Sequence, residues 1–212
     1  LWLVVLTAIF TIPIGVSTAL YLEEFASDNL FNKMIKINVS NLAGVPSIIY
    51  GLLGLAFFTY TLALGKSLLA GALTMTLLVL PIVIIASQEA IRTIQPSLKD
   101  AAYALGATKW EVSKRVILPH SIGGIMSGII LAMSRAIGET APILIISSLV
   151  FITMVPSGPL DRFTILPLQI YTWAAFPQDD FRAIASTGII VLLFILVVMN
   201  SIAVYIRFKT QD

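Results

Sequence analysis

Long apolar runs alternate with short polar segments along the chain. A run of about twenty apolar residues is long enough to cross the roughly 30 Å hydrocarbon layer of a bilayer. The pattern predicts about five membrane-spanning helices, at residues 1–22, 41–64, 67–87, 119–138 and 183–206. It therefore indicates an all-α, polytopic transmembrane helical bundle, which we expect to be a single transmembrane domain over residues 1–212.

The apolar stretch 119–155 is too long for one crossing. A polar sequence, Gly138-Glu139-Thr140-Ala141-Pro142, interrupts it and predicts a break in the helix. We expect residues 141–155 to continue as a short outer helix or a re-entrant segment. Prolines and aromatic residues in 156–180 are typical of an outer loop at the membrane interface.

Composition agrees with a membrane protein, since 58% of the residues are hydrophobic and 11% are charged. A soluble domain carries about 25% charged residues. The chain has no cysteine and one histidine, His120, so it cannot form a disulfide, a cysteine metal site or a histidine cluster. The net charge of +2 gives no reason to expect a nucleic-acid partner.

The placement of Lys and Arg predicts the orientation in the membrane, because cytoplasmic loops carry an excess of positive charge. Nine basic residues fall in 23–40, 88–118 and the C-terminal end, against three on the other side. The three are Lys66, Arg162 and Arg182. We therefore expect the 88–118 loop and the C-terminus to be cytoplasmic, which five crossings allow.

Segment 88–118 is a charged, amphipathic island between two apolar runs. It predicts two short helices joined near Gly106. The first is expected over Leu98 to Leu105, with Asp100 in its first turn, where a carboxylate stabilises the helix dipole. Gly106 would end that helix, since glycine adopts a left-handed conformation at little cost.

The apolar side of this island is expected to bind a partner. Ala102, Leu105, Gly106 and Trp110 would insert into a groove of another protein, as amphipathic helices commonly do. The alternative is a solvated connector between two spans.

Arg135 and Glu139 lie within an otherwise apolar stretch and are four residues apart, so they share one helix face. A charge at membrane depth costs several kcal/mol unless it is paired or hydrated, and it usually marks a pathway. The guanidinium of Arg135 could receive an anion while Glu139 holds or releases it, with Ser134 and Thr140 as neutral donors. The alternatives are a structural ion pair that locks two helices and a pair that lies near the outer headgroups.

Two groups of small or kinking residues are expected to shape the helices. Pro46, Ser47 and Gly51, in Pro46-Ser47-Ile48-Ile49-Tyr50-Gly51, indicate a kink and close packing, with substrate contact equally open. Gly124 and Gly128 form a small-xxx-small pair, which we expect to pack against a partner membrane subunit.

Part of the 88–118 segment resembles a known motif. The matching residues are Asp100-Ala101-Ala102, Gly106, Val116 and Leu118-Pro119. In this spacing they resemble the EAA loop of ABC-importer permeases, with Asp100 at a usual Glu and Val116 at a usual Ile.

A second resemblance covers nearly the whole chain. Ser134 to Pro142 contains R-x-x-G-E-T-A-P, a segment similar to that of phosphate-importer permeases of the PstA type. Other segments agree: Ile12-Pro13-Ile14-Gly15, Tyr21-Leu22-Glu23-Glu24-Phe25, Val45 to Leu52, and Leu166 to Trp173. The family has one span more at the N-terminus, so we expect a preceding span that this sequence lacks.

The resemblance implies a type I, MetI-like ABC-importer fold in a prokaryotic plasma (inner) membrane. It implies a second homologous permease subunit, a dimer of ATP-binding subunits docked on the 89–112 helices, and an external phosphate-binding protein. ATP and magnesium would bind the partner ATPase, and this chain would bind no cofactor. Gly65-Lys66-Ser67 does not make a P-loop, since Tyr60 stands where that motif needs glycine.

Other functions remain open at this stage. Within transport, the substrate could be molybdate or sulfate. A membrane-embedded enzyme would need His120 to meet Glu139, but nineteen helical residues separate them by roughly 28 Å. A passive channel or scaffold would have no use for an ATPase-docking loop.

Overall fold

The structure, a computed structural model, describes residues 1–147 and 156–211. Every element within these residues is a helix, as expected. In chain order they are α1 (Trp2–Leu20), η1 (Tyr21–Phe25), α2 (Leu30–Ala43), α3 (Ser47–Gly54), η2 (Leu55–Thr61), α4 (Leu68–Arg92), α5 (Pro96–Ala104), α6 (Lys109–Val112), η3 (Ser113–Ile117), α7 (Leu118–Gly138), α8 (Ala141–Ser147), α9 (Leu166–Ala175) and α10 (Asp179–Gln211). The elements η1, η2 and η3 are π-helical turns.

The described residues contain 4 helices long and apolar enough to cross a membrane. They are Trp2–Phe25, Leu68–Arg92, Lys109–Gly138 and Asp179–Ile202. A fifth candidate is the pair Leu30–Ala43 and Ser47–Thr61, bent by 102°. The number of spans agrees with the expected five if this bent pair is one broken span.

The bent pair corrects the expected boundaries of the second span. Residues 41–64 do not form one straight helix, and much of 23–40 is the helix α2 instead of a connection. Proline explains the break, because the ring of Pro46 disfavours helical geometry at the preceding residue and removes a backbone donor. The α2 helix ends at Ala43, and α3 begins just after Pro46.

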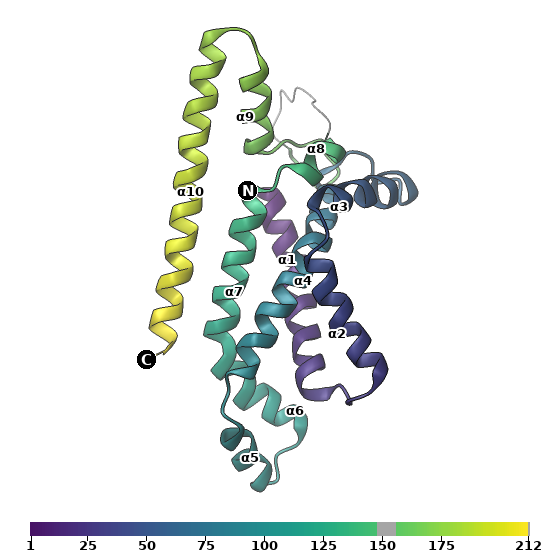
Figure 1. Ribbon diagram of the computed structural model, residues 1–212, viewed down its shortest axis with the longest axis vertical. Coiled ribbons are helices and arrows are strands. Elements are labelled where there is room, and N and C mark those ends of the chain that lie inside the picture. The colour runs from purple at the N-terminus through teal and green to yellow at the C-terminus, as the bar shows by residue number, and fades with distance from the viewer. Residues whose placement is uncertain (148–155, 212) are drawn as a thin grey trace.

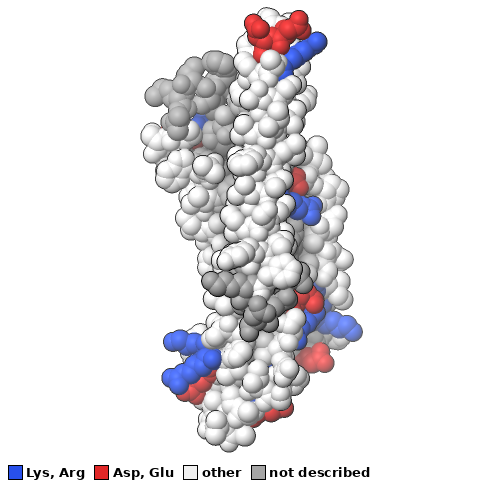
Figure 2. All heavy atoms as spheres, turned by 90° about the vertical axis from the view of Figure 1, so that its left-hand side faces the viewer, with Lys and Arg blue, Asp and Glu red and all other residues white. Residues whose placement is uncertain are grey.

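The helices are arranged so that the loops gather at two ends (Figure 1). The turn between η1 and α2 lies at the same end as α5 and α6, whereas α9 and the start of α10 lie at the opposite end. Figure 2 shows Lys, Arg, Asp and Glu concentrated towards the two ends of the visible face, with a mostly uncharged surface between them. This distribution suits a chain whose middle lies in hydrocarbon.

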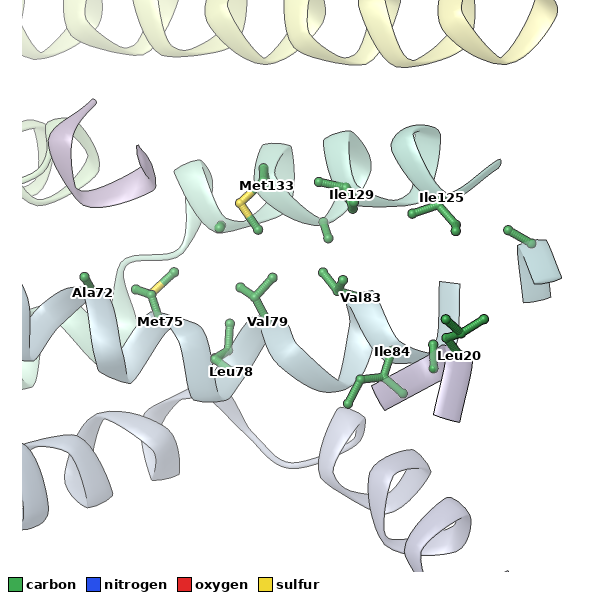
Figure 3. Packing of buried hydrophobic residues seen from close by; sticks show 14 of the residues in the cluster. Leu20, Ala72, Met75, Leu78, Val79, Val83, Ile84, Ile125, Ile129 and Met133 are labelled. Atoms are coloured by element: carbon green, nitrogen blue, oxygen red, sulfur yellow. The ribbon is translucent and has the colours of Figure 1, made fainter. Parts of the chain in front are cut away.

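The core forms where α4 faces α7 (Figure 3). The facing residues are Met75, Val79 and Val83 on α4 and Ile125, Ile129 and Met133 on α7, all buried. Membrane helices associate through such close packing, because lipid tails are as apolar as the side chains themselves. The α4 helix is therefore the central element, and α10 packs outside it against α7 and α9.

Gly124 and Gly128 belong to this packing. A Cβ at Gly124 would lie 2.9 Å from the Cβ of Ala90, and one at Gly128 would lie 2.6 Å from the Cβ of Ala86. Both neighbours are on α4 of the same chain. The expectation of packing is thus met within this chain, and the expectation that these glycines face a partner permease is wrong.

Candidate functional site

The helix break at residues 138–141 is present as expected. The α7 helix ends at Gly138, and Glu139 has extended backbone with φ −74° and ψ 117°. The α8 helix then begins at Ala141. Of the expected outer segment 141–155, residues 148–155 lie outside the described residues. The break places Glu139 at a corner of the backbone, just after the helix that carries Arg135.

Arg135 and Glu139 form a loose ion pair, with Nε and Oε1 3.6 Å apart. The Arg135 side chain is 62% exposed and that of Glu139 is 18% exposed. Among the described residues this contact is the only ion pair of Arg135. Since the guanidinium carries five N–H donors, most of its donor capacity is available to another ligand.

A cavity of about 230 Å³ opens beside Arg135. Arg135 lines it together with Pro46, Ser47 and Tyr50, the backbone around Gly44, and two aliphatic side chains of α4. The two segments that the sequence singled out separately, around Pro46 and around Arg135, therefore meet at one cavity.

Gly51 explains how these two segments come so close. A Cβ at Gly51 would lie 2.7 Å from the Cα of Pro142, nearer than any real side chain could approach. The α3 helix thus packs its backbone directly on the start of α8. The absent side chain lets the P-S-I-x-x-G segment, which lines the cavity through Pro46, Ser47 and Tyr50, contact the G-E-T-A-P segment that follows Arg135.

The bend between α2 and α3 is held by a side chain. The Tyr50 hydroxyl donates to the carbonyl oxygen of Leu42 at 2.7 Å, across the break. Pro46, the N-cap of α3, offers no side-chain acceptor to the first turn. The positive end of the α3 dipole consequently lies at the cavity without a capping side chain, where it favours an anion.

Ser134 and Thr140 do not line this cavity. Ser134 is 4% exposed on the packed side of α7. The Thr140 hydroxyl donates weakly to the carbonyl oxygen of Gly138 at 3.5 Å. Ser47 is the hydroxyl residue that lines the cavity together with Arg135. From the sequence, the segment of Ser47 was expected to form a kink, and contact with a substrate was left open.

Polar residues continue along one face of α2, away from the cavity. Lys33, Lys36, Ser40, Asn41 and Gly44 recur at spacings of three, four, one and three residues, which places them on one side of a helix. Ile35 and Val39, on another side, pack against the core. Ile37, which is 51% exposed, lies on the same side, so this face is polar except at Ile37. We call it the polar face of α2, and it runs from the η1–α2 end of the molecule to the cavity beside Arg135.

The 88–118 segment folds as two helical pieces, and one detail of the expectation is wrong. The α5 helix begins at Pro96, so Asp100 is its fifth residue and not in the first turn. Asp100 and Ala101 are exposed. Proline fits the first helical position because it has no N–H to leave unsatisfied, and it starts the helix two residues earlier than expected.

Gly106 has φ +84°, as expected for the residue that ends the first piece. The second piece starts with a capping box that our reading of the sequence missed, although Thr108-Lys109-Trp110-Glu111 carries its signature. From Lys109 to Gly138 the chain forms one helix, which includes the π-helical turn η3 (Ser113–Ile117). The α6 and α7 helices are therefore parts of one continuous helix.

The loop exposes apolar side chains at the end of the molecule. Leu105 is 89% exposed and Trp110 is 60% exposed, whereas Ala102 is half-buried and packs against the core. A hollow of about 330 Å³ lies beside Leu105 and Gly106, between α5 and α6. Of the expected apolar side, Leu105, Gly106 and Trp110 are thus free to bind a partner, and Ala102 faces inward.

An ionic network at the end of α1 was also missed. Glu23 accepts two hydrogen bonds from Arg92, at 2.9 and 3.0 Å, and one from Gln88 at 2.8 Å. Lys36 lies 3.4 Å from the same carboxylate. Lys99 pairs with the neighbouring Glu24.

We call these residues, Glu23, Glu24, Lys36, Gln88, Arg92 and Lys99, the η1 ionic network. The sequence did carry a signal for this network. Glu23 and Glu24 follow directly after an apolar run, and basic residues occur in the two segments, 23–40 and 88–118, that are expected on the same side of the membrane. A nearly buried carboxylate needs a cationic partner.

His120 and Glu139 lie at opposite ends of α7. His120 is exposed, and its Nδ1 is 2.6 Å from the carbonyl oxygen of Val116 in the preceding turn. An acid–base pair of these two residues is therefore not formed, which removes the basis for a membrane-embedded enzyme.

Comparison with known proteins agrees with this geometry. The phosphate transport system permease protein PstA 1 of Mycobacterium tuberculosis (strain CDC 1551 / Oshkosh) is 35% identical over 205 residues, which are 95% of this chain and 66% of that protein. The probable ABC transporter permease protein YqgI of Bacillus subtilis (strain 168) is 32% identical over 211 residues, 94% of this chain and 72% of that protein. The chain thus spans just under two thirds of the length of the PstA 1 relative.

A solved structure supports the fold. The inward-facing MetNI methionine ABC transporter superposes with a TM-score of 0.77 at 15% identity, covering 98% of this chain and 91% of that chain. The family described as "Binding-protein-dependent transport system inner membrane component" matches residues 11–211. The chain therefore belongs to this family, as a multi-pass ABC transporter permease with a MetI-type fold.

Proposed function

We propose that this chain is the permease subunit of an ATP-driven phosphate importer and forms half of its translocation pathway. The observation that carries the proposal is the cavity where Arg135 meets Pro46 and Ser47. The names of the PstA relatives support phosphate as the substrate. A cation with one loose partner, beside a hydroxyl and a helix N-terminus, suits an oxyanion.

The loose pairing also suits a transporter better than a storage site. A carrier must release its ligand in each cycle, so its contacts have to be few. Glu139, 3.6 Å from Arg135, lowers the net positive charge at the cavity and competes with the anion for the guanidinium. The polar face of α2 would then form the route from the cavity to the cytoplasmic side.

Coupling to ATP would use the other end of the molecule. The exposed Leu105 and Trp110, with the hollow beside Gly106, would dock on one of two ATPase subunits. Those subunits would bind ATP and magnesium. A second homologous permease and an external phosphate-binding protein would complete the importer, with the 88–118 loop and the C-terminus in the cytoplasm of a prokaryote.

The experiment is uptake of labelled phosphate into vesicles that contain the complete importer and its binding protein. Arg135→Ala is expected to lower the rate at least tenfold, because the cavity loses its only cation among the described residues. Arg135→Lys is expected to be impaired too, since an ammonium lacks the planar donor fork.

Arg182→Ala is the matched control. Arg182 forms a similar pair, with Asp179 at 3.6 Å, and is 67% exposed, but it lies at the outer end of α10. It should transport phosphate like the wild type. Normal uptake by both Arg135 variants would refute the role of the cavity, and competition by sulfate or molybdate as strong as by phosphate would indicate the wider oxyanion class.

A further inference from the structure

The α5 helix is tied to the rest of the chain by few contacts. None of its residues is buried. Among the described residues, one side-chain bond links α5 or α6 to anything outside segment 88–118. It joins Lys99 Nζ to Glu24 Oε1, at 2.5 Å. Among the described residues, α5 and α6 are therefore attached to the end of α1 at a single polar point.

The environment makes this one bond strong. The Glu24 side chain is 10% exposed and that of Lys99 is 23% exposed. A charge-assisted hydrogen bond is shorter and stronger than a neutral one, and removal from water increases the attraction. Separation of the two groups would leave a nearly buried carboxylate unpaired, which is costly. The pair consequently resists being pulled apart when α5 moves.

Glu24 is adjacent to Glu23, which bonds to side chains of two other helices, α2 and α4. Glu23 binds Arg92 and Gln88 at the end of α4, and it pairs with Lys36 on α2. Since Glu23 and Glu24 are adjacent in η1, a force on Glu24 acts on the same short segment that holds α2 and α4. The η1 ionic network thus connects α5 to three helices.

The other helices reach the loop through the backbone. The α6 helix continues into α7, and three residues, 93–95, join α4 to α5. The α1 and α2 helices precede this region and have no direct backbone link to it. Their polar connection to α5 is the Glu24–Lys99 pair. This matters for transport because α2 carries the polar face and leads to the cavity beside Arg135.

We propose that Glu24 and Lys99 are a positioning pair that transmits displacement of the coupling helix to α1 and α2, so that ATPase closure moves the anion cavity. The proposal rests on the proposed function of the 88–118 loop. The pair is not a substrate contact. It stays formed through the cycle and keeps ATP hydrolysis linked to transport.

The test is the number of phosphate ions transported per ATP hydrolysed by the complete reconstituted importer. Glu24→Lys and Lys99→Glu should each lower this ratio at least tenfold, while the assembled importer still hydrolyses ATP. The exchanged double variant, Glu24→Lys with Lys99→Glu, should recover the ratio to within about threefold of the wild type. Lys99→Arg should keep the wild-type ratio, because it preserves the charge and a donor.

Asp28→Lys is the matched control, with the same change of charge four residues further along, in the connection between η1 and α2, at an exposed position without an ion pair among the described residues. It should leave the ratio unchanged. A wild-type ratio in Glu24→Lys, or no recovery in the exchanged variant, would overturn the proposal. If the reversed single variants fail to assemble, Glu24→Gln decides, since a normal ratio with a neutral side chain would equally overturn it.

The same vesicles separate this inference from the proposed function. Absence of phosphate uptake in the wild type would count against phosphate as the substrate, and the ratio measured with the anion actually carried would still decide the role of the pair. Normal wild-type uptake with unchanged ratios in the variants would refute the pair alone.

Discussion

The η1 ionic network and the Arg135–Glu139 pair show two uses of charge in one apolar chain. In the network, Glu23 is 12% exposed and receives bonds at 2.8 to 3.0 Å from two side chains of α4. At the cavity, Arg135 is 62% exposed and its contact with Glu139 is 3.6 Å long. The Glu23 carboxylate is fully engaged by its partners, whereas most N–H donors of the Arg135 guanidinium have no partner among the described residues.

This difference is the one expected between a structural ion pair and a charge that is accessible to a ligand. A nearly buried charge with several short bonds holds helices together and costs much to disturb. An exposed charge with one loose partner contributes little to stability, so it can exchange that partner for a ligand. The two regions should therefore lose very different amounts of stability when their carboxylates are removed.

The largest effect on stability is expected at Glu23. Glu23→Gln would leave Lys36 without its anionic partner and Arg92 with Glu89 alone, and it should destabilise the solubilised protein by about 3 kcal/mol, the low end for a buried pair because Arg92 is half-exposed. Glu139→Gln should cost about 1 kcal/mol or less, because its one partner, Arg135, is 62% exposed and lies 3.6 Å away. Thermal unfolding of both variants in the same detergent measures the contrast. Equal losses of stability in the two variants would contradict the distinction between a structural network at Glu23 and a loosely paired charge at Arg135.

A smaller effect is expected where the backbone, not charge, fixes the cavity. Gly51→Val would push a side chain against the backbone of Pro142, whose Cα lies 2.7 Å from the ideal Cβ position. Overpacking of this kind costs about 2 kcal/mol and should displace Glu139 from Arg135, so phosphate uptake should fall as well.

Gly158→Ala is the control for Gly51→Val, because the nearest atom to its Cβ, in the Asp161 carboxylate, is 3.8 Å away, an ordinary contact. Thermal unfolding and uptake should both match the wild type in this variant. Normal uptake by Gly51→Val would mean that the α3–α8 contact does not position the cavity.

The smallest effect concerns a carboxylate that has neutral donors only. Asp161 accepts hydrogen bonds from the Ser157 hydroxyl and from the N–H groups of Ser157 and Gly158, which hold the pKa of Asp161 below its ordinary value of 3.8. Stabilisation from a lowered pKa is present above 3.8 and is lost as the pH falls through the folded value. The unfolding temperatures of wild type and Asp161→Asn should therefore differ slightly at pH 7 and converge below pH 3.8. A gap that stays constant with pH would contradict this assignment.

Much of the site could be read from the sequence because its signals are local. The break at 138–142 follows from a proline and a glutamate in an apolar run, and the left-handed Gly106 follows from the end of a short helix. The position of Asp100 was misjudged because helix starts are set by single residues, and Pro96 supplied one two residues early.

Contacts between distant segments could not be read in the same way. Nothing local shows that Gly51 lies on Pro142, that Ser47 shares a cavity with Arg135, or that Gly128 faces Ala86 of the same chain. Small residues predict close packing but do not name the neighbour. The bend at Pro46 was foreseen as a kink, yet its size of 102° depends on how α3 packs on α8.

The sequence by itself determined that this protein is an all-helical membrane protein with a charged, amphipathic loop between two spans, because hydrophobic runs, prolines, glycines and charge placement act within a few residues of where they stand. Only the tertiary structure decided which charged side chains form buried ion pairs between helices and which stay exposed with one loose partner. Pairing depends on distance and burial in space, and Glu23 finds Arg92 sixty-nine residues further along the chain.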